Sequence, residues 1–187
     1  CGATAGIAAT FNAPIAGAFF SLEIILGNFA FASFGPLVIS SVAATGISHY
    51  FFKDQPAFEV PSFALGNVFE YTSIVFLGIA AGLFALVFVI SVYKTEDLFD
   101  AVRIPLYVKA AFGGLLIGVM GLINPGFLGV GYDTMGPILK DPASLSLGVL
   151  ALLLLLKILG TSITLGSGGS GGIFAPSLFM GAMLGAA

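Results

Sequence analysis

The chain has 187 residues, of which 58% are hydrophobic and 8% are charged, and its formal net charge is −3. Soluble domains carry about 25% charged residues, so this composition excludes an ordinary water-facing surface and predicts an integral, multi-pass membrane protein, expected in the cell membrane. The acidic balance argues against nucleic acid as a partner. With one cysteine and one histidine, we expect no metal centre, no cofactor and no enzymatic activity.

The first apolar segment, residues 3–26, is interrupted once, at Asn12 and Pro14. Asparagine is a favoured N-cap and proline is favoured in a first helical turn. The pattern therefore predicts one short helix before Asn12 and a second from Pro14 to about residue 26. Each is shorter than the roughly 20 residues that cross a bilayer. We expect broken or re-entrant helices that are shielded by protein.

Longer apolar segments follow, and they predict spanning helices over about 33–52, 67–93, 105–122 and 144–163. The polar residues 53–66 predict a loop, the charge-rich residues 94–103 predict an aqueous connection, and 123–142 predicts turns with a short helix after Thr134. Lys157 lies within the last span. A lysine that snorkels or pairs with an acidic group near a helix end is favoured there over a positive field that draws anions inward.

The segment from Gly166 to Ala187 begins with seven uncharged small residues, GSGGSGG, and continues into an apolar helix-compatible run. A flexible linker is the alternative interpretation, but such a linker between apolar segments would leave unsatisfied backbone in lipid. Glycine allows close approach to an ion, and N–H groups at a helix start inside a membrane form an anion site. We predict that the backbone N–H groups of Ile173, Phe174 and Ala175 bind the anion. Supporting roles are predicted for the adjoining residues Gly171, Gly172 and Pro176.

The chain contains GATAGIAATFNAPIAGAFFSLE at 2–23, GVGY at 129–132 and GGIFAP at 171–176. Together these three motifs resemble the CLC family of chloride channels and chloride/proton antiporters. The resemblance implies an all-α, polytopic membrane fold with inverted repeats and broken helices, a homodimer with one pore per subunit, and chloride as the transported ligand. It further implies a partial chain, with residues 1–66 ending the first half and 67–187 starting the second. The family's gating glutamate, pore serine and pore tyrosine would lie outside it.

Glu23 bears on whether the transport is coupled to protons. An ionisable residue on an apolar helix is a candidate functional residue, and the alternative is a helix-end residue facing water. In antiporters of the family a glutamate pair commonly ends this helix, and the second glutamate accepts the proton. Here Ile24 follows Glu23, and isoleucine cannot take a proton. The resemblance implies chloride transport, with voltage gating left open.

Three alternatives remain from the sequence. One is a proton-coupled antiporter with Glu23 on the proton path, and another is a fluoride-selective member of the same family. Outside the family, a structural membrane protein is the alternative, and it predicts no dependence of stability or flux on anions.

Overall fold

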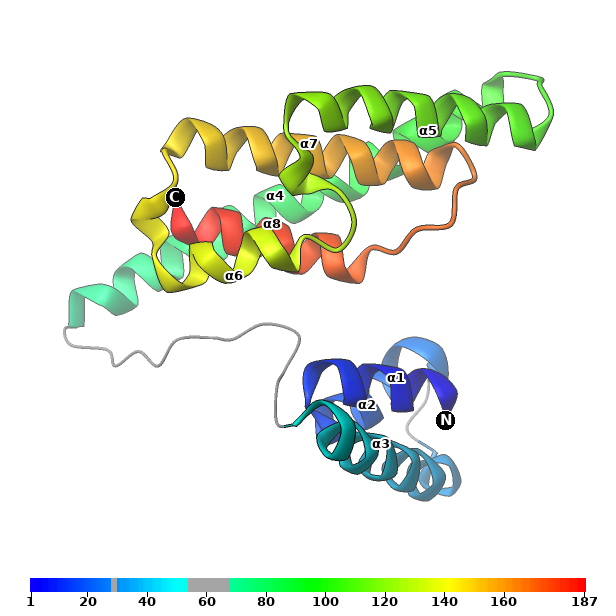
Figure 1. The fold of residues 1–187 in the computed structure, drawn as a ribbon, viewed down its shortest axis with the longest axis vertical. Coiled ribbons are helices and arrows are strands. Elements are labelled where there is room, and N and C mark those ends of the chain that lie inside the picture. The colour runs from blue at the N-terminus through cyan, green and yellow to red at the C-terminus, as the bar shows by residue number, and fades with distance from the viewer. Residues whose placement is uncertain (28–29, 54–67) are drawn as a thin grey trace. The chain divides into compact units, whose positions relative to one another are not determined.

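The computed structural model describes residues 1–27, 30–53 and 68–187, and the regular structure in these ranges is helical (Figure 1). The chain divides into two compact units, Cys1–Glu59 and Val60–Ala187. The first contains α1 (Gly2–Phe11), α2 (Pro14–Phe20), a π-helical turn (Ser21–Ile25) and α3 (Phe31–Phe52). The second contains α4 (Val68–Ala101), α5 (Leu106–Ile123), α6 (Tyr132–Lys140), α7 (Leu147–Gly166) and α8 (Phe174–Ala186), with 3₁₀ turns at Pro125–Phe127 and Pro142–Ser144. The predicted all-α class is confirmed. Apart from Lys53, the loop predicted over 53–66 lies outside the described residues.

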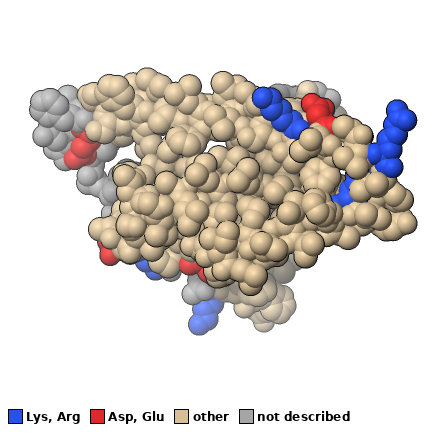
Figure 2. Space-filling view, turned by 90° about the horizontal axis from the view of Figure 1, so that it is seen from above, with Lys and Arg blue, Asp and Glu red and all other residues tan. Residues whose placement is uncertain are grey.

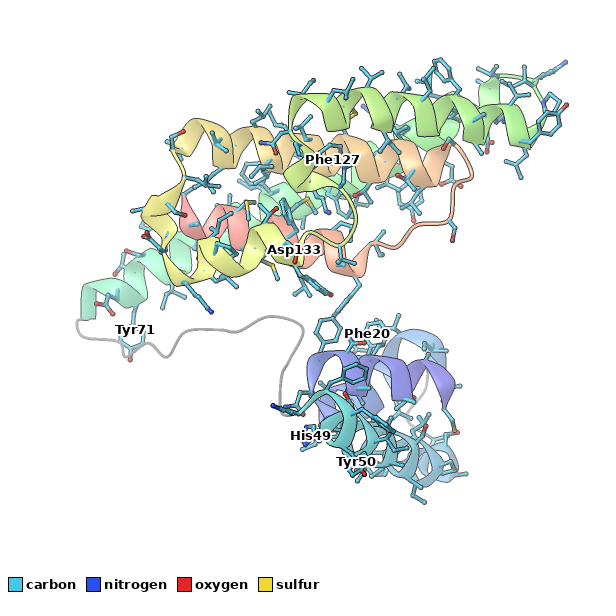
Figure 3. The ribbon with its side chains drawn as sticks, viewed as in Figure 1. Phe20, His49, Tyr50, Tyr71, Phe127 and Asp133 are labelled. Carbon is cyan, nitrogen blue, oxygen red and sulfur yellow. The ribbon has the colours of Figure 1, made fainter. Side chains whose placement is uncertain are left out.

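The first unit contains the predicted corner between two short helices. α1 ends at Phe11 and α2 begins at Pro14, whose fixed φ suits a first turn. Asn12 is the C-cap of α1 in the left-handed conformation, with φ of 53°, so its interpretation as an N-cap is wrong. Its Oδ1 contacts Nε2 of His49 on α3, and His49 is labelled in Figure 3. His49 therefore connects α3 to the corner by a hydrogen bond.

Small and hydroxylated residues bring α1 and α2 close together. A Cβ on Gly17 would lie 3.0 Å from both Ala8 N and Thr4 O. Beside this crossing, the buried Thr4 Oγ1 donates to Ser21 Oγ at 2.6 Å, which satisfies two polar groups inside the unit. After α2 the helix changes to a π-helical turn at Ser21–Ile25, and hydropathy does not predict this change of hydrogen-bond register. Glu23 lies on this turn and is exposed.

Within the described residues, three helices are long and apolar enough to cross a membrane: Glu70–Ala101 of α4, α5 and α7. The prediction of a connection over 94–103 is wrong, because α4 continues to Ala101. Its 34 residues give a length of roughly 50 Å at 1.5 Å per residue, against a hydrocarbon core of about 30 Å. The charged end can therefore remain helical beyond the lipid, since lysine and glutamate are good helix formers.

α7 lies at the centre of the second unit and packs against α4, α5 and α8 (Figure 1). Two glycines allow its closest crossings. A Cβ on Gly166 would lie 2.9 Å from the backbone carbon of Thr95 on α4, and a Cβ on Gly113 of α5 would lie 2.2 Å from Ser167 Oγ. The sequence also contains GxxxG pairs on α4, α5 and α8, a spacing typical of close helix crossings in membranes, but these glycines make no close crossing within the described chain. A Cβ would meet no atom of the described chain within 4 Å at Gly78, Gly82, Gly114, Gly118, Gly181 or Gly185.

The surface carries few charged side chains over the face drawn in Figure 2. On α5, for example, the side chains of Leu115 and Leu122 are 64% and 86% exposed. An extended apolar surface of this kind favours contact with lipid or with further protein rather than with water.

Candidate anion-binding site

The loop between α7 and α8 begins as a helix C-cap. Gly168 N–H donates to Leu165 O at 3.0 Å, and Gly169 N–H donates to Thr164 O at 2.8 Å. Gly168 adopts the left-handed conformation, with φ of 80°. These two bonds around a left-handed glycine form a Schellman motif. The first part of the glycine run thus satisfies the last carbonyl groups of α7.

The rest of the run packs back onto α7. A Cβ on Gly169 would lie 2.8 Å from Thr164 O, and a Cβ on Gly171 would lie 2.9 Å from Thr164 Cγ2. A Cβ on Gly172 would meet nothing within 4 Å. Close packing against one threonine therefore requires glycine at 169 and 171, but not at 172. The loop stays near the end of α7, which fixes where α8 begins.

α8 begins at Phe174 with Ile173 as its N-cap residue, and the side chain of Ile173 makes no capping hydrogen bond. Ser177 N–H donates to Ile173 O at 3.0 Å, which starts the hydrogen-bond ladder of the helix. Pro176 is buried and, being proline, has no N–H. The side chains of Ile173 and Phe174 are 58% and 42% exposed. The predicted helix start is confirmed to within one residue.

The electrostatics of this helix start follow from the peptide dipoles. An α-helix provides no internal acceptor for the N–H groups of its first turn, and the aligned dipoles place about half a positive charge there. The first turn of α8 contains no acidic residue that would neutralise this partial charge. The start of α8 therefore has the character of an anion site without a fixed positive side chain.

Lys157 lies on α7 and is only 2% exposed. Its ammonium donates to Phe127 O at 2.8 Å and to Gly129 O at 2.7 Å, and it lies 4.7 Å from the centre of the Phe179 ring on α8. The expectation of a snorkelling or ion-paired lysine is wrong, because the partners that the structure gives this ammonium are backbone carbonyls and an aromatic ring.

Sequence reasoning also missed the residues around that lysine. A Cβ on Gly160 would lie 2.6 Å from the Phe127 ring, which is labelled beside α7 in Figure 3. A Cβ on Gly131 would lie 2.4 Å from the Phe179 ring. Each glycine thus makes room for an aromatic side chain from another segment. The GVGY motif at 129–132 was the sequence signal for this packing, but it served only as evidence for the family resemblance.

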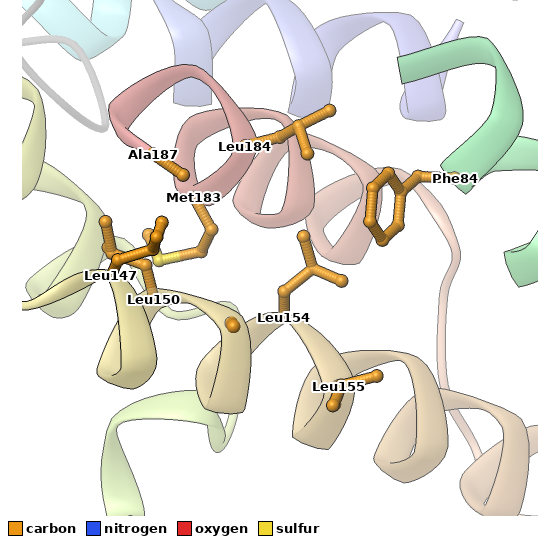
Figure 4. Close-up of a pocket in the computed structure, with 9 residues that line it drawn as sticks. Phe84, Leu147, Leu150, Leu154, Leu155, Met183, Leu184 and Ala187 are labelled. Atoms are coloured by element: carbon orange, nitrogen blue, oxygen red, sulfur yellow. The ribbon is translucent and has the colours of Figure 1, made fainter. Parts of the chain in front are cut away.

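One pocket of about 300 Å³ lies between α4, α7 and α8 (Figure 4). Its lining is entirely apolar: Phe84, Leu147, Leu150, Ala151, Leu154, Leu155, Met183, Leu184 and Ala187. Almost none of the surface that lines this pocket is polar, backbone included, so it suits chloride less well than the start of α8. No group of three or more histidine, cysteine or acidic residues suited to a metal ion occurs in ranges 1–27, 30–53 and 68–187.

The structure brings the predicted residues Gly171 to Pro176 together as one continuous segment at the start of α8. Glu23 lies in the other unit, on the π-helical turn, and its side chain is exposed there. Ile24 beside it is 63% exposed. Each predicted site therefore lies within its own compact unit.

The apolar helices, the short helices broken at Asn12 and the loop-to-helix segment at 166–176 define a multi-pass helical membrane protein. The family model for the voltage gated chloride channel matches residues 1–187. The chain therefore belongs to the CLC family of voltage-gated chloride channels, which are not enzymes.

Curated relatives agree with this assignment. A putative chloride channel protein ClcB-like from Ralstonia nicotianae is 36% identical over 185 residues, which cover 99% of this chain and 43% of the relative. The voltage-gated ClC-type chloride channel ClcB of Citrobacter koseri is 34% identical over 99% of this chain and 44% of its own length. The ClcB of Escherichia coli O9:H4 is 32% identical over the same shares. The chain spans less than half the length of these relatives.

Proposed function

We propose that the intact protein transports chloride through a CLC-type pore, and that the backbone N–H groups of Ile173, Phe174 and Ala175 bind the ion. The observation that carries this proposal is the start of α8, which has no side-chain cap and no acidic residue in its first turn. In a chain of this family, an exposed helix N-terminus with positive dipole character is suited to a chloride ion.

The supporting residues have distinct roles in this proposal. Gly171 packs on Thr164 and holds the loop against α7, whereas Gly172 leaves open space beside the helix start. Pro176 is buried in the first turn of α8, and its ring holds the backbone φ at a helical value. These residues place the N–H groups without providing a full positive charge. Because no fixed cation lies among these donors in the proposal, chloride is held loosely enough to leave again.

The chain supplies one wall of this pore in our proposal. Residues 1–66 would end the first inverted half of the protein and residues 67–187 would start the second. The complete pathway would form in a homodimer, with one pore in each subunit. Residues from outside this chain would complete the chloride site.

We further propose that transport is not tightly coupled to protons. Ile24 replaces the acid that follows Glu23 in coupled relatives, and a hydrocarbon side chain cannot carry a proton. The exposed position of Glu23 on the π-helical turn keeps antiport, with Glu23 as the inner acceptor, as the second candidate.

The first test uses the intact protein reconstituted in liposomes that hold a chloride gradient. Chloride efflux and external pH are recorded together while an ionophore clamps the voltage. We expect chloride efflux without stoichiometric proton movement. Efflux with uphill proton movement that Glu23→Gln abolishes would support the antiporter instead. No flux of chloride or fluoride from folded protein would contradict the proposed function.

A further inference from the structure

The strongest feature outside the proposed chloride site is the buried Lys157. A lysine side chain carries three donors and no acceptor, and a charge inside a membrane protein is expensive unless it is compensated. Two of its donors reach the carbonyls of Phe127 and Gly129. Uncharged partners of this kind solvate the ammonium without neutralising it.

These two carbonyls belong to a segment about 30 residues earlier in the chain. Phe127 ends a 3₁₀ turn after α5, and Gly129 leads into the turn before α6. Gly129 and Gly131 both adopt positive φ, at 61° and 81°. Glycine adopts this left-handed conformation without a steric penalty and so allows a tight turn. The turn directs the carbonyls of Phe127 and Gly129 toward the same ammonium, that of Lys157.

On its other side the ammonium meets α8. Phe179 is completely buried and its ring centre lies 4.7 Å from the ammonium, within the range of a cation–π contact. The same ring also packs against Gly131, because a Cβ on Gly131 would lie only 2.4 Å from it. Phe179 therefore packs against both Lys157 and the left-handed Gly131, and it lies five residues after the first residue of α8.

We propose that Lys157 is a positioning residue for the chloride site. Its ammonium joins the Phe127–Gly129 turn to Phe179 and thereby fixes α8, whose first turn contains the proposed chloride ligands. Loss of the ammonium leaves the buried carbonyl of Phe127 and the part-buried carbonyl of Gly129 without this donor and removes the cation–π contact of Phe179. The start of α8 then shifts or fluctuates, and chloride binding weakens. This inference rests on the proposed function, because it needs a chloride site at α8.

The test compares Lys157→Met with wild type in the intact protein. Chloride affinity is measured by calorimetry on the detergent-solubilised protein, and thermal stability is measured on the same samples. We expect Lys157→Met to weaken chloride binding about tenfold. Lys157→Arg keeps a buried cation, so its chloride affinity should stay much closer to that of wild type. Lys94→Met is the matched control, because it removes an exposed lysine from α4; its chloride affinity should equal that of wild type.

A second pair of variants tests the contact through the ring. Phe179→Leu removes the aromatic face from Lys157, whereas Phe88→Leu removes a similarly buried ring from α4. Both should lower thermal stability, but only Phe179→Leu should weaken chloride binding severalfold. This pair decides the matter if Lys157→Met does not fold.

The outcomes separate the two proposals. Wild-type protein that binds no chloride would contradict the proposed function itself. Wild-type protein that binds chloride, together with folded Lys157→Met and Phe179→Leu variants of unchanged affinity, would overturn the positioning role alone. Lower stability with unchanged affinity would show that Lys157 only supports the fold.

Discussion

Replacing the amide N–H of Ala175 with an ester oxygen is expected to weaken chloride binding by about tenfold or more. Lactic acid in place of Ala175 makes this change and keeps the methyl side chain. A hydrogen bond to a charged group contributes about 1.5–3 kcal/mol, and about 1.4 kcal/mol corresponds to a factor of ten in the dissociation constant. Chloride affinity of the intact protein, measured by calorimetry, is the direct readout.

The matched control is lactic acid in place of Ala182, which lies in the same helix. There the ester removes a hydrogen bond inside the helix, so stability falls slightly and chloride affinity is unchanged. Equal losses of affinity in the two variants would point to a general weakening of α8. An unchanged affinity at both positions would remove the N–H group of Ala175 from the chloride site.

Any side chain at position 166 is expected to disrupt the crossing of α4 and α7. A Cβ on Gly166 would lie 2.9 Å from the backbone carbon of Thr95 and 3.0 Å from the backbone nitrogen of Glu96. Backbone atoms of a packed helix cannot rotate away as a side chain can. We expect Gly166→Ala to destabilise the protein by about 1–3 kcal/mol, the usual range for overpacking, and Gly166→Leu to prevent recovery of folded protein.

Gly148 provides the control in the same helix, because a Cβ there would meet nothing within 4 Å in this structure. Alanine is the better helix former by about 1 kcal/mol, so Gly148→Ala should leave thermal stability unchanged or slightly higher. Size-exclusion chromatography after heating measures both series. Gly166→Ala protein that is as stable as Gly148→Ala protein would contradict the proposed close crossing.

The sequence predicted the positions of the helices well, because long apolar runs in a membrane protein favour helices. Of the four predicted spans, however, α3 is not among the three helices of the described residues that are long and apolar enough to cross. The prediction failed over residues 94–103, where a polar, charged segment predicted a connecting loop. The charged residues after Tyr93 extend α4 to Ala101, since a helix can leave the membrane and continue in water. It also missed the π-helical turn at Ser21–Ile25, because a change of helical register leaves hydropathy unaltered.

The helix start that contains the proposed chloride site could be predicted from the sequence, because one motif marks it. The glycine run marks the start of α8, but sequence alone could not divide it into a C-cap at Gly168 and a packed loop at Gly171. Lys157 was misinterpreted for a related reason. Its partners are backbone carbonyls and a ring from distant segments, and a carbonyl acceptor has no signature in the sequence.

The capped loop between α7 and α8 limits where this protein can bend. Gly168 and Gly169 are hydrogen-bonded to the end of α7, and Gly169 and Gly171 have no room for a side chain beside Thr164. A hinge needs residues whose dihedral angles can change without collision, and these residues lack that freedom. α7 and the loop as far as Gly171 should therefore move as one rigid body, and Gly172, where a Cβ would meet nothing within 4 Å, is the glycine of this connection with room to bend.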